Sequence, residues 1–241
     1  MTERERQLLD CAAEVPGERP LRIRLDRIDG PEPGRTRPLS TEGESLYILQ
    51  DARGSLMLEG AGAEWKYFIG APTAVWIAAG VRSEFVNTGD ARVRGVRFGV
   101  VPQNSASADA SKNPHSSFIV DLGSLAQRCM VSFLTRTVCA PDGSHGLLRL
   151  SEIQTILPGG SVPAHGHPDR SEACYVLCGT AVFSLAGSER SLSAGEALFI
   201  PPSGLHSVRN RSDEVLEYVI AQFGASAAVP RIPTESEKGK S

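Results

Sequence analysis

The sequence predicts an all-β protein made of two β barrels in tandem, preceded by a short helix. Short runs rich in Val, Ile, Leu, Phe, Tyr and Trp recur between Gly, Pro, Asp and Asn residues, as in antiparallel strands joined by turns. A small, polar, proline-bounded stretch separates these runs into two groups that resemble each other in sequence. At 241 residues the chain is long enough for two barrels that each bury a core.

The expected helix covers residues 2–13, within an N-terminal segment of residues 1–20. Thr2 and Glu5 have the spacing of a capping box, in which each side chain bonds the backbone N–H near the other. The apolar stripe of this helix would consist of Leu8, Leu9 and Ala12.

The first barrel is expected over residues 21–100 and the second over residues 118–225. Strands of the first barrel are placed at residues 45–50, 54–59, 65–69, 74–78, 84–87 and 93–100. Residues 101–117 have the composition of a linker, and residues 226–241 that of a polar tail.

An internal repeat relates the two barrels. Residues 44–50 align with residues 172–178, and residues 75–87 align with residues 198–210. The alignment places Arg37, Leu39 and Ser83 at the positions of three histidines of the second half, and only Glu44 keeps a ligand type. One carboxylate without imidazoles does not hold a transition metal tightly, so the first barrel is expected to be metal-free and structural.

Four side chains in the second half indicate a metal site. His165 and His167 are two residues apart, which places both imidazoles on the same face of a strand. Glu172 follows a Pro-Asp turn, and His206 comes from a third strand. Three neutral imidazoles and one carboxylate suit a divalent first-row metal and leave up to two octahedral positions for water, substrate or dioxygen.

The same region resembles the cupin superfamily. Its first motif, G-x5-H-x-H-x4-E-x6-G, matches residues 159–179 without a gap, and the second motif is similar to residues 195–210. The resemblance implies a bicupin with a degenerate N-terminal barrel and a metal-binding C-terminal barrel. The implied ligands are His165, His167, Glu172 and His206. One position departs from the pattern, because Gly204 lies one residue later than the motif's glycine, which puts the shape of this turn in doubt.

Several alternatives stay open at these residues. The histidines could be surface or hydrogen-bonding residues, and a metal could serve only to hold the barrel together. Further candidates for orienting a substrate are Arg209, Tyr218 and Gln222, each with a structural role as the alternative. His145, at a predicted turn, either lines the mouth of the barrel or is a solvated loop residue. Cys174 shares the strand parity of Glu172 and is either near the metal or a small buried residue. Tyr47 and Tyr175 align between the halves and are expected to pack.

The resemblance implies a metal-dependent enzyme that acts on a small carboxylate or enolisable molecule. Oxygenase chemistry is the leading hypothesis, with iron, manganese or nickel as the metal and zinc, cobalt or copper as alternatives. The first rival is a non-redox isomerase, lyase or hydrolase, similar to bicupins of the ureidoglycine aminohydrolase type, whose ligand spacing differs. The second is a cupin that binds a small molecule without converting it.

Composition narrows the partners and the compartment. A net charge of −3 provides no basic surface, so neither nucleic acid nor an anionic membrane is expected as a partner. Five cysteines without a C-x2-C pair suit a reducing compartment, and no apolar run is long enough to span a bilayer. A cytoplasmic protein is expected, with a possible homodimer formed through an exposed barrel edge.

Overall fold

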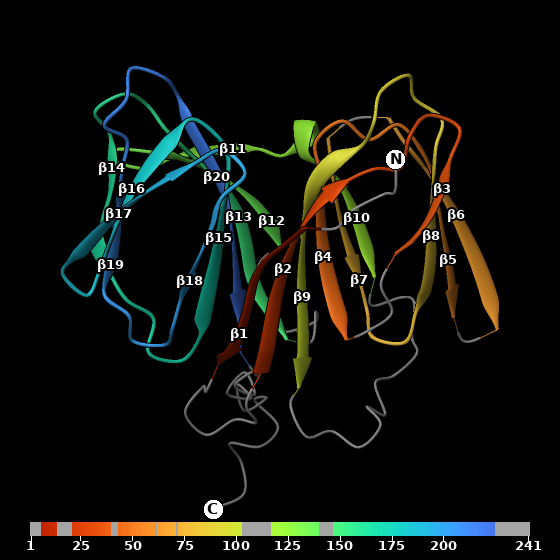
Figure 1. Cartoon of the computed structure of the whole chain (residues 1–241), viewed down its shortest axis with the longest axis horizontal. Helices are drawn as coiled ribbons and strands as arrows, with labels where there is room; N and C mark the ends of the chain where they lie inside the picture. Colours follow the sequence, from red (N-terminus) through yellow and green to blue (C-terminus); the bar gives the residue numbers. More distant parts are fainter. Residues whose placement is uncertain are drawn as a thin grey trace, which may run out of the picture.

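The computed structural model describes residues 6–13, 21–39, 43–60, 62–70, 72–102, 117–139 and 147–224. Within these residues the chain forms strands and one short 3-10 helix, arranged as two barrels side by side (Figure 1). Each barrel consists of a six-stranded sheet and a four-stranded sheet. The expected all-β class and the pair of barrels are confirmed. His145, the expected tail and most of the expected linker lie outside the described residues.

The N-terminal barrel has a six-stranded sheet in the order β1-β2-β9-β4-β7-β10 and a four-stranded sheet in the order β3-β8-β5-β6. The strands of the larger sheet are β1 (Arg6–Ala13), β2 (Leu21–Asp29), β4 (Glu44–Leu49), β7 (Thr73–Ile77), β9 (Arg94–Pro102) and β10 (Phe118–Asp121). Those of the smaller sheet are β3 (Thr36–Leu39), β5 (Gly54–Gly60), β6 (Ala63–Ile69) and β8 (Arg82–Asn87). The short helix η2 (Leu122–Ser124) follows β10.

The C-terminal barrel repeats this plan with sheets in the orders β11-β12-β13-β20-β15-β18 and β14-β19-β16-β17. The larger sheet contains β11 (Gln127–Cys129), β12 (Leu134–Cys139), β13 (Leu148–Ile156), β15 (Ser171–Cys178), β18 (Ala197–Ile200) and β20 (Leu216–Phe223). The smaller sheet contains β14 (Ser161–His165), β16 (Thr180–Leu185), β17 (Ser188–Ser193) and β19 (His206–Arg209).

The predicted N-terminal helix is wrong where the structure describes it. Residues Arg6–Ala13 form strand β1, which pairs antiparallel with β2 along its whole length. An isolated helix of about 12 residues is marginal in water, whereas the free edge of β2 supplies backbone hydrogen-bond partners to a strand that lies beside it. Asp10 adds a bidentate ion pair with Arg22 across this pairing, at 2.6 and 2.9 Å.

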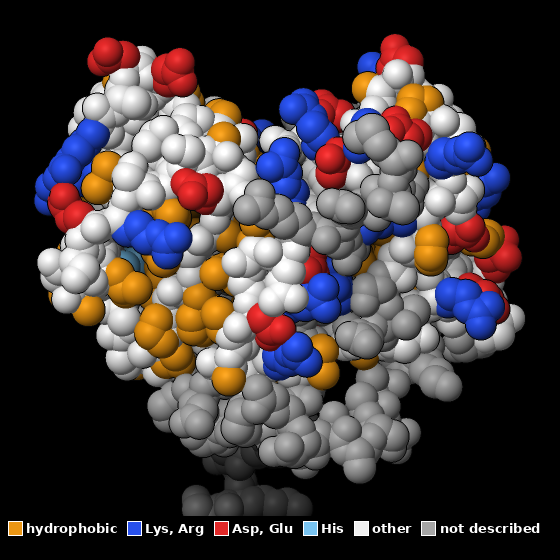
Figure 2. Space-filling view, in the orientation of Figure 1, with side chains coloured by type: hydrophobic (Ala, Val, Ile, Leu, Met, Phe, Trp, Pro, Cys, Tyr) orange, Lys and Arg blue, Asp and Glu red, His pale blue; other side chains and the backbone are white. Residues whose placement is uncertain are grey.

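The two barrels share one apolar core. Each six-stranded sheet contributes one face to it, and the buried contributors include Ile23, Leu46, Trp76 and Phe98 from the first half and Ala173, Tyr175, Val219 and Phe223 from the second. Each barrel also has its own interior cluster. The chain crosses between the barrels as well, because β10 follows the expected linker yet pairs with β7 of the N-terminal sheet. Figure 2 shows a notch between the two barrels and acidic and basic side chains interspersed on both.

Two buried asparagines confirm the internal repeat. Asn87 donates to the carbonyls of Pro31 and Ala91 and accepts from the N–H of Gly89. Asn210 repeats the pattern, since it donates to Ile156 and Glu214 and accepts from the N–H of Ser212, again two residues onward. Each asparagine therefore ties the end of one strand to the loop that follows it.

The strand pairing shifts the expected alignment of the repeat. Ser45 lies opposite Ile77 as Glu172 lies opposite Ile200, so Ser45 rather than Glu44 takes the place of Glu172. Shifting a strand by one residue moves its side chains to the other face. Tyr47 accordingly lies inside its barrel, whereas Tyr175 lies in the core between the barrels.

A second shift concerns the histidine positions. Leu39 lies opposite Ser83 as His165 lies opposite His206, so Leu39 rather than Arg37 takes the place of His165. Two differences of one residue add up to this shift. The strand register moves the counterpart of Glu172 from Glu44 to Ser45, and His165 lies seven positions before Glu172 whereas Leu39 lies six positions before Ser45.

Candidate metal centre

Three histidines converge at one end of the C-terminal barrel. His165 ends β14, His206 begins β19, and the two residues lie directly opposite each other in the pairing of these strands. His167 follows two residues after His165, and its carbonyl accepts a hydrogen bond of 2.8 Å from the N–H of Ser203. Ring nitrogens of the three imidazoles all lie within 4.8 Å of one another. The expected cluster of three histidines is confirmed.

Backbone carbonyls orient two of the imidazoles. Nδ1 of His165 lies 2.9 Å from the carbonyl of Pro163, and Nδ1 of His206 lies 2.8 Å from the carbonyl of Gly204. Each Nδ1 therefore carries the proton and donates it, which leaves Nε2 with a free lone pair. The Nε2 atom of His206 is buried and has no hydrogen-bond partner among the described residues. A lone pair that is buried, aimed at two other imidazoles and otherwise unused fits a metal ion.

Glu172 lies on β15, next to the histidines. Its carboxylate oxygens lie 3.5 Å from Nε2 of His206 and 3.6 Å from Nε2 of His167. Burial acts to raise the pKa of Glu172, but His206, Gln222 and the charge of His167 more than offset it, so the pKa lies below its usual value. The carboxylate is therefore ionised, as a metal ligand has to be.

The same contacts move the pKa values of two histidines in opposite directions. Burial lowers the pKa of His167, and the charge of Glu172 only partly reverses this. In His206 burial also lowers the pKa, but the contact with Glu172 outweighs it and leaves the pKa raised.

Gln222 connects the cluster to an arginine. Its amide nitrogen lies 2.7 Å from Glu172 Oε2, to which it donates, and 3.1 Å from Nε2 of His167. Its amide oxygen accepts a hydrogen bond of 3.2 Å from Arg170, which is also paired with Asp169. Arg170 was not among the sequence candidates, although its place between His167 and Glu172 was a signal for it.

The other candidates lie in different surroundings. Arg209 is exposed on β19, where the neighbouring Val208 points into the barrel, so it does not join the cluster. Tyr218 is buried, donates its hydroxyl proton to Gln154 and packs edge-on against Phe183. Burial raises the pKa of Tyr218 well above its usual value, so the hydroxyl stays protonated.

Cys174 lies next to Glu172 inside the barrel. Its Sγ lies 3.4 Å from Glu172 Oε1. Burial raises the pKa of this thiol well above its usual value, so it donates a proton as a neutral S–H group. Cys174 is both buried and near the site, so both of the alternatives that the sequence left open apply to it.

The N-terminal barrel places an arginine where the C-terminal barrel has Glu172 and Gln222. Gly99 lies opposite Ser45 as Gln222 lies opposite Glu172. The guanidinium of Arg97 fills this place, because Nε donates to Ser45 at 3.1 Å and a Cβ on Gly99 would come within 3.0 Å of it. Arg97 also pairs with the fully buried Asp26 at 3.1 Å.

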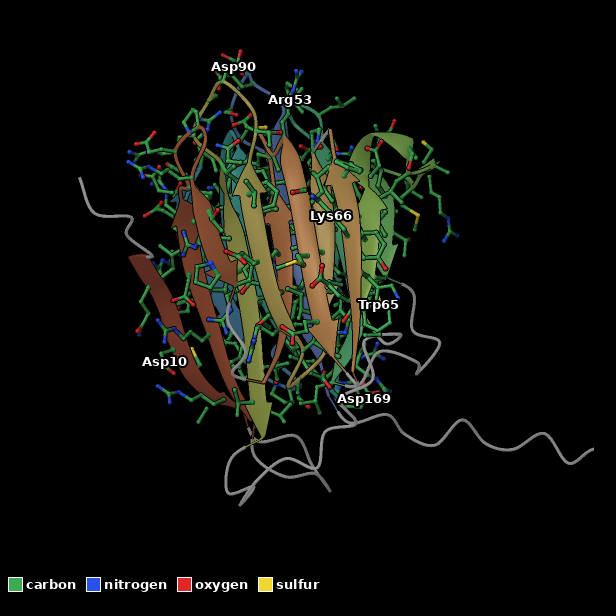
Figure 3. The ribbon with its side chains drawn as sticks, turned by 90° about the vertical axis from the view of Figure 1, so that its right-hand side faces the viewer. Asp10, Arg53, Trp65, Lys66, Asp90 and Asp169 are labelled. Atoms are coloured by element: carbon green, nitrogen blue, oxygen red, sulfur yellow. The ribbon has the colours of Figure 1, made fainter. Side chains whose placement is uncertain are left out.

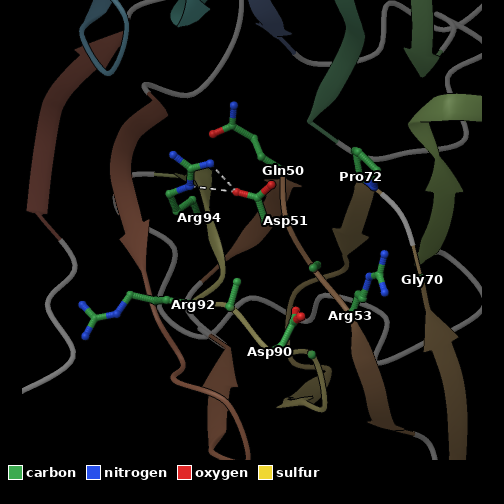
Figure 4. Close-up of a pocket in the computed structure, with 11 residues that line it drawn as sticks. Gln50, Asp51, Arg53, Gly70, Pro72, Asp90, Arg92 and Arg94 are labelled. Atoms are coloured by element: carbon green, nitrogen blue, oxygen red, sulfur yellow. Dashed lines mark hydrogen bonds and ion pairs between the residues drawn. The ribbon is translucent and has the colours of Figure 1, made fainter.

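A separate cleft of about 670 Å³ lies among the loops of the N-terminal barrel (Figure 4). Its lining includes Arg53, Arg92 and Arg94. Arg94 pairs with Asp51 at 2.6 Å, and Arg92 pairs with Asp29 at 3.3 Å. The histidines do not line this cleft, and carboxylates neutralise two of its three arginines.

Comparisons with known proteins agree with this geometry. Residues 152–221 match the Cupin domain family. The chain as a whole has a bicupin fold. An oxalate-binding protein of Thermotoga maritima is 31% identical over 78 residues, which cover 32% of this chain and 64% of that protein. Germin-like protein 3-1 of Oryza sativa is 30% identical over 97 residues, covering 33% of this chain and 43% of that protein. The matched parts thus span less than two thirds of either relative.

Solved structures share the fold of the whole chain. The structure of oxalate decarboxylase from Bacillus subtilis at pH 4.6 is similar with a TM-score of 0.68 and 12% identity, covering 94% of this chain and 77% of that one. A structure from a study of the Mn(II) centres of the same enzyme has a TM-score of 0.66 and 14% identity, covering 94% and 78%. At such identities the likeness concerns the fold. No helix in the described part of the chain has the length and hydropathy to cross a membrane.

Proposed function

We propose that this bicupin is a metal-dependent enzyme whose C-terminal barrel binds a small carboxylate on a divalent transition metal. The observation that carries the proposal is the convergence of three imidazoles on a buried, ionised carboxylate. The proposed ligands are His165, His167, Glu172 and His206. Manganese is supported by the Mn(II) centres named for a protein of the same fold, and iron or nickel suits the same nitrogen-rich set.

The charge of the site favours an anionic ligand. Three neutral imidazoles and one carboxylate leave a divalent ion with a net charge near +1. When bound, the ion supplies Lewis acidity and, if redox-active, a site for dioxygen. The guanidinium of Arg170 also lies beside His167 and Gln222, where it is paired with Asp169. A small carboxylate fits the charge of the metal, and the names of the oxalate-binding relative and of oxalate decarboxylase support oxalate as the first candidate.

Gln222 is proposed to position the site. Because Arg170 donates to its amide oxygen, the amide nitrogen faces Glu172 and His167. That nitrogen orients the carboxylate and offers a second N–H to a ligand oxygen bound beside it. Loss of such a hydrogen bond commonly lowers metal affinity about 10- to 100-fold. Tyr218 is proposed to support the barrel interior, and Arg209 to have no role at the site.

Metal analysis tests the ligand set. His165→Ala combined with His167→Ala should abolish metal binding while the fold persists, because the apolar cores remain. Gln222→Ala should retain metal with about tenfold weaker affinity. Arg209→Ala is the matched control, since this side chain comes from the same strand as His206 and is exposed. Full metal content in the double histidine variant would contradict the assignment.

Reconstitution tests the reaction. The apo protein, loaded separately with manganese(II), iron(II), nickel(II) and zinc(II), is incubated with oxalate and other small carboxylates with and without dioxygen. Dioxygen consumption coupled to substrate loss would support the oxygenase chemistry expected from the sequence. Equal anaerobic turnover of oxalate with one proton, to formate and carbon dioxide, would support a lyase instead. Binding without turnover under every condition would contradict an enzyme and favour a binding protein.

A further inference from the structure

Strand β6 exposes aromatic side chains at a sheet edge. Within the described part of the chain, β6 pairs only with β5 and so ends the four-stranded sheet. Phe68 is 85% exposed and Tyr67 is 40% exposed. Figure 3 looks onto this side of the molecule, with Trp65 and Lys66 of β6 labelled. An exposed edge strand rich in aromatic residues offers both backbone partners and apolar surface to another chain.

The equivalent strand of the other barrel lacks these features. β17 ends its four-stranded sheet as β6 does, but its residues Ser188–Ser193 have the sequence SERSLS. Small polar and charged residues on an edge discourage pairing with other chains. β6 and β17 occupy equivalent positions in the two barrels. The fold therefore does not require exposed aromatic residues at this position, and they are a feature of β6 alone.

Two charged side chains of β6 are left without an ion pair in the described structure. Lys66 places its Nζ over the ring of Phe68, 5.9 Å from the ring centroid. Glu64 lies opposite Glu59 of β5, a like charge, and Glu59 itself pairs with Arg82 at 3.1 Å. Glu64 therefore faces an acidic residue on the neighbouring strand and has no ion-pair partner among the described residues.

We propose that β6 pairs antiparallel with β6 of a second copy of this chain, on a twofold axis through Trp65. Directly opposed residues of an antiparallel pair share a face, so the axis has to pass through a residue. With the axis through Trp65, Glu64 lies opposite the partner's Lys66, and the same pair forms again on the other side of the axis. An axis through Lys66 would oppose two lysines, and an axis through Glu64 would oppose two glutamates.

The same register matches large side chains to small ones. Tyr67 lies opposite Ala63, the first residue of β6 in the second copy, and Phe68 then extends past the end of that strand toward the turn residue Gly62. Gly62 has no heavy atom within 4 Å of where a Cβ would lie, so its surroundings are open. The pairing joins two four-stranded sheets into one continuous sheet with a self-complementary edge, as a twofold dimer requires.

Charge reversal and exchange test this dimer. The full-length protein should be dimeric by light scattering and sedimentation. Glu64→Lys and Lys66→Glu should each weaken the dimer roughly tenfold or more, because each places like charges opposite each other twice. The double variant Glu64→Lys/Lys66→Glu should recover the wild-type dissociation constant. Mixing the two single variants should also produce a dimer, since one chain then carries two lysines and the other two glutamates.

Ser191→Glu on the equivalent strand β17 is the matched control and should leave the dimer unchanged. Metal content of every variant should equal that of the wild type, which separates this test from that of the metal centre. A monomeric wild type would overturn the proposal. Dimers that persist in both single variants, or a double variant that fails to recover, would place the interface elsewhere.

Discussion

At the scale of single residues, the turn before His206 shows how the site tolerates its departure from the family motif. Ser203 stands where the motif has glycine, and its φ is 62°, in the left-handed region that glycine normally occupies. The turn therefore keeps its shape with a serine, at a conformational cost of about 1 kcal/mol or more. The motif glycines Gly159, Gly179 and Gly195 also have positive φ values, of 77°, 76° and 88°.

Ser203→Gly should stabilise the protein by up to about 1 kcal/mol, because relief of the left-handed conformation exceeds the entropy that glycine loses on folding. Chemical denaturation of the apo protein measures this. Gly204→Ala is the opposite control, since its Cβ would approach the carbonyl of Pro201 at 3.0 Å and Cγ2 of Ile200 at 3.1 Å. A less stable Ser203→Gly variant would show that the serine side chain contributes more than its conformation costs.

At the scale of elements, the start of β4 is tied to the start of β13. The carboxylate of Glu44 accepts a hydrogen bond of 2.8 Å from the N–H of Leu147. A side chain of the first barrel therefore bonds the backbone just before a strand of the second barrel. Burial raises the pKa of Glu44 from 4.5 to about 7, and the bond from Leu147 opposes this shift. The residue that the sequence alignment placed at a ligand position is therefore a contact between the barrels.

Glu44 should make stability fall as pH rises. Its pKa is higher in the folded protein than in the unfolded chain, so the folded state binds the proton more tightly. The resulting stabilisation is complete below pH 4.5 and is lost as pH rises through about 7. Glu44→Gln should remove this dependence, and its stability relative to wild type should increase by up to about 3 kcal/mol across that range. Denaturation at several pH values measures the difference, and parallel curves for both proteins would contradict it.

At the scale of the whole molecule, the core between the barrels makes them one unit. Both six-stranded sheets bury a face in it, so neither barrel can separate without exposing apolar surface. The two barrels also differ in what they hold at equivalent places. The C-terminal barrel carries the histidine cluster, and the N-terminal barrel fills that place with Arg97, Ser45 and Asp26.

The two barrels should therefore unfold in a single transition. Val219→Ala removes buried volume on the C-terminal side of the shared core and should cost about 2 kcal/mol. Both tryptophans, Trp65 and Trp76, lie in the N-terminal barrel, so their fluorescence reports on the other side. The fluorescence midpoint should fall together with the calorimetric one. An unchanged fluorescence transition would show that the barrels unfold independently.

The sequence by itself determined the β class, the repeat and the cluster of His165, His167 and His206. These features depend on local spacing: alternation along strands, glycines at turns and ligands that a tight turn brings together. It also placed Glu172 and Gln222 close to the cluster, because both belong to neighbouring strands of one sheet.

The tertiary structure alone decided the remaining features. Residues 6–13 form a strand because the free edge of β2 lies beside them. The local sequence of residues 6–13 does not indicate that this edge is available. The counterparts of Glu172 and His165 became Ser45 and Leu39, since the pairing of neighbouring strands sets the register. Such pairing depends on chain segments far apart in sequence, and a shift of one residue reverses the face to which every side chain points.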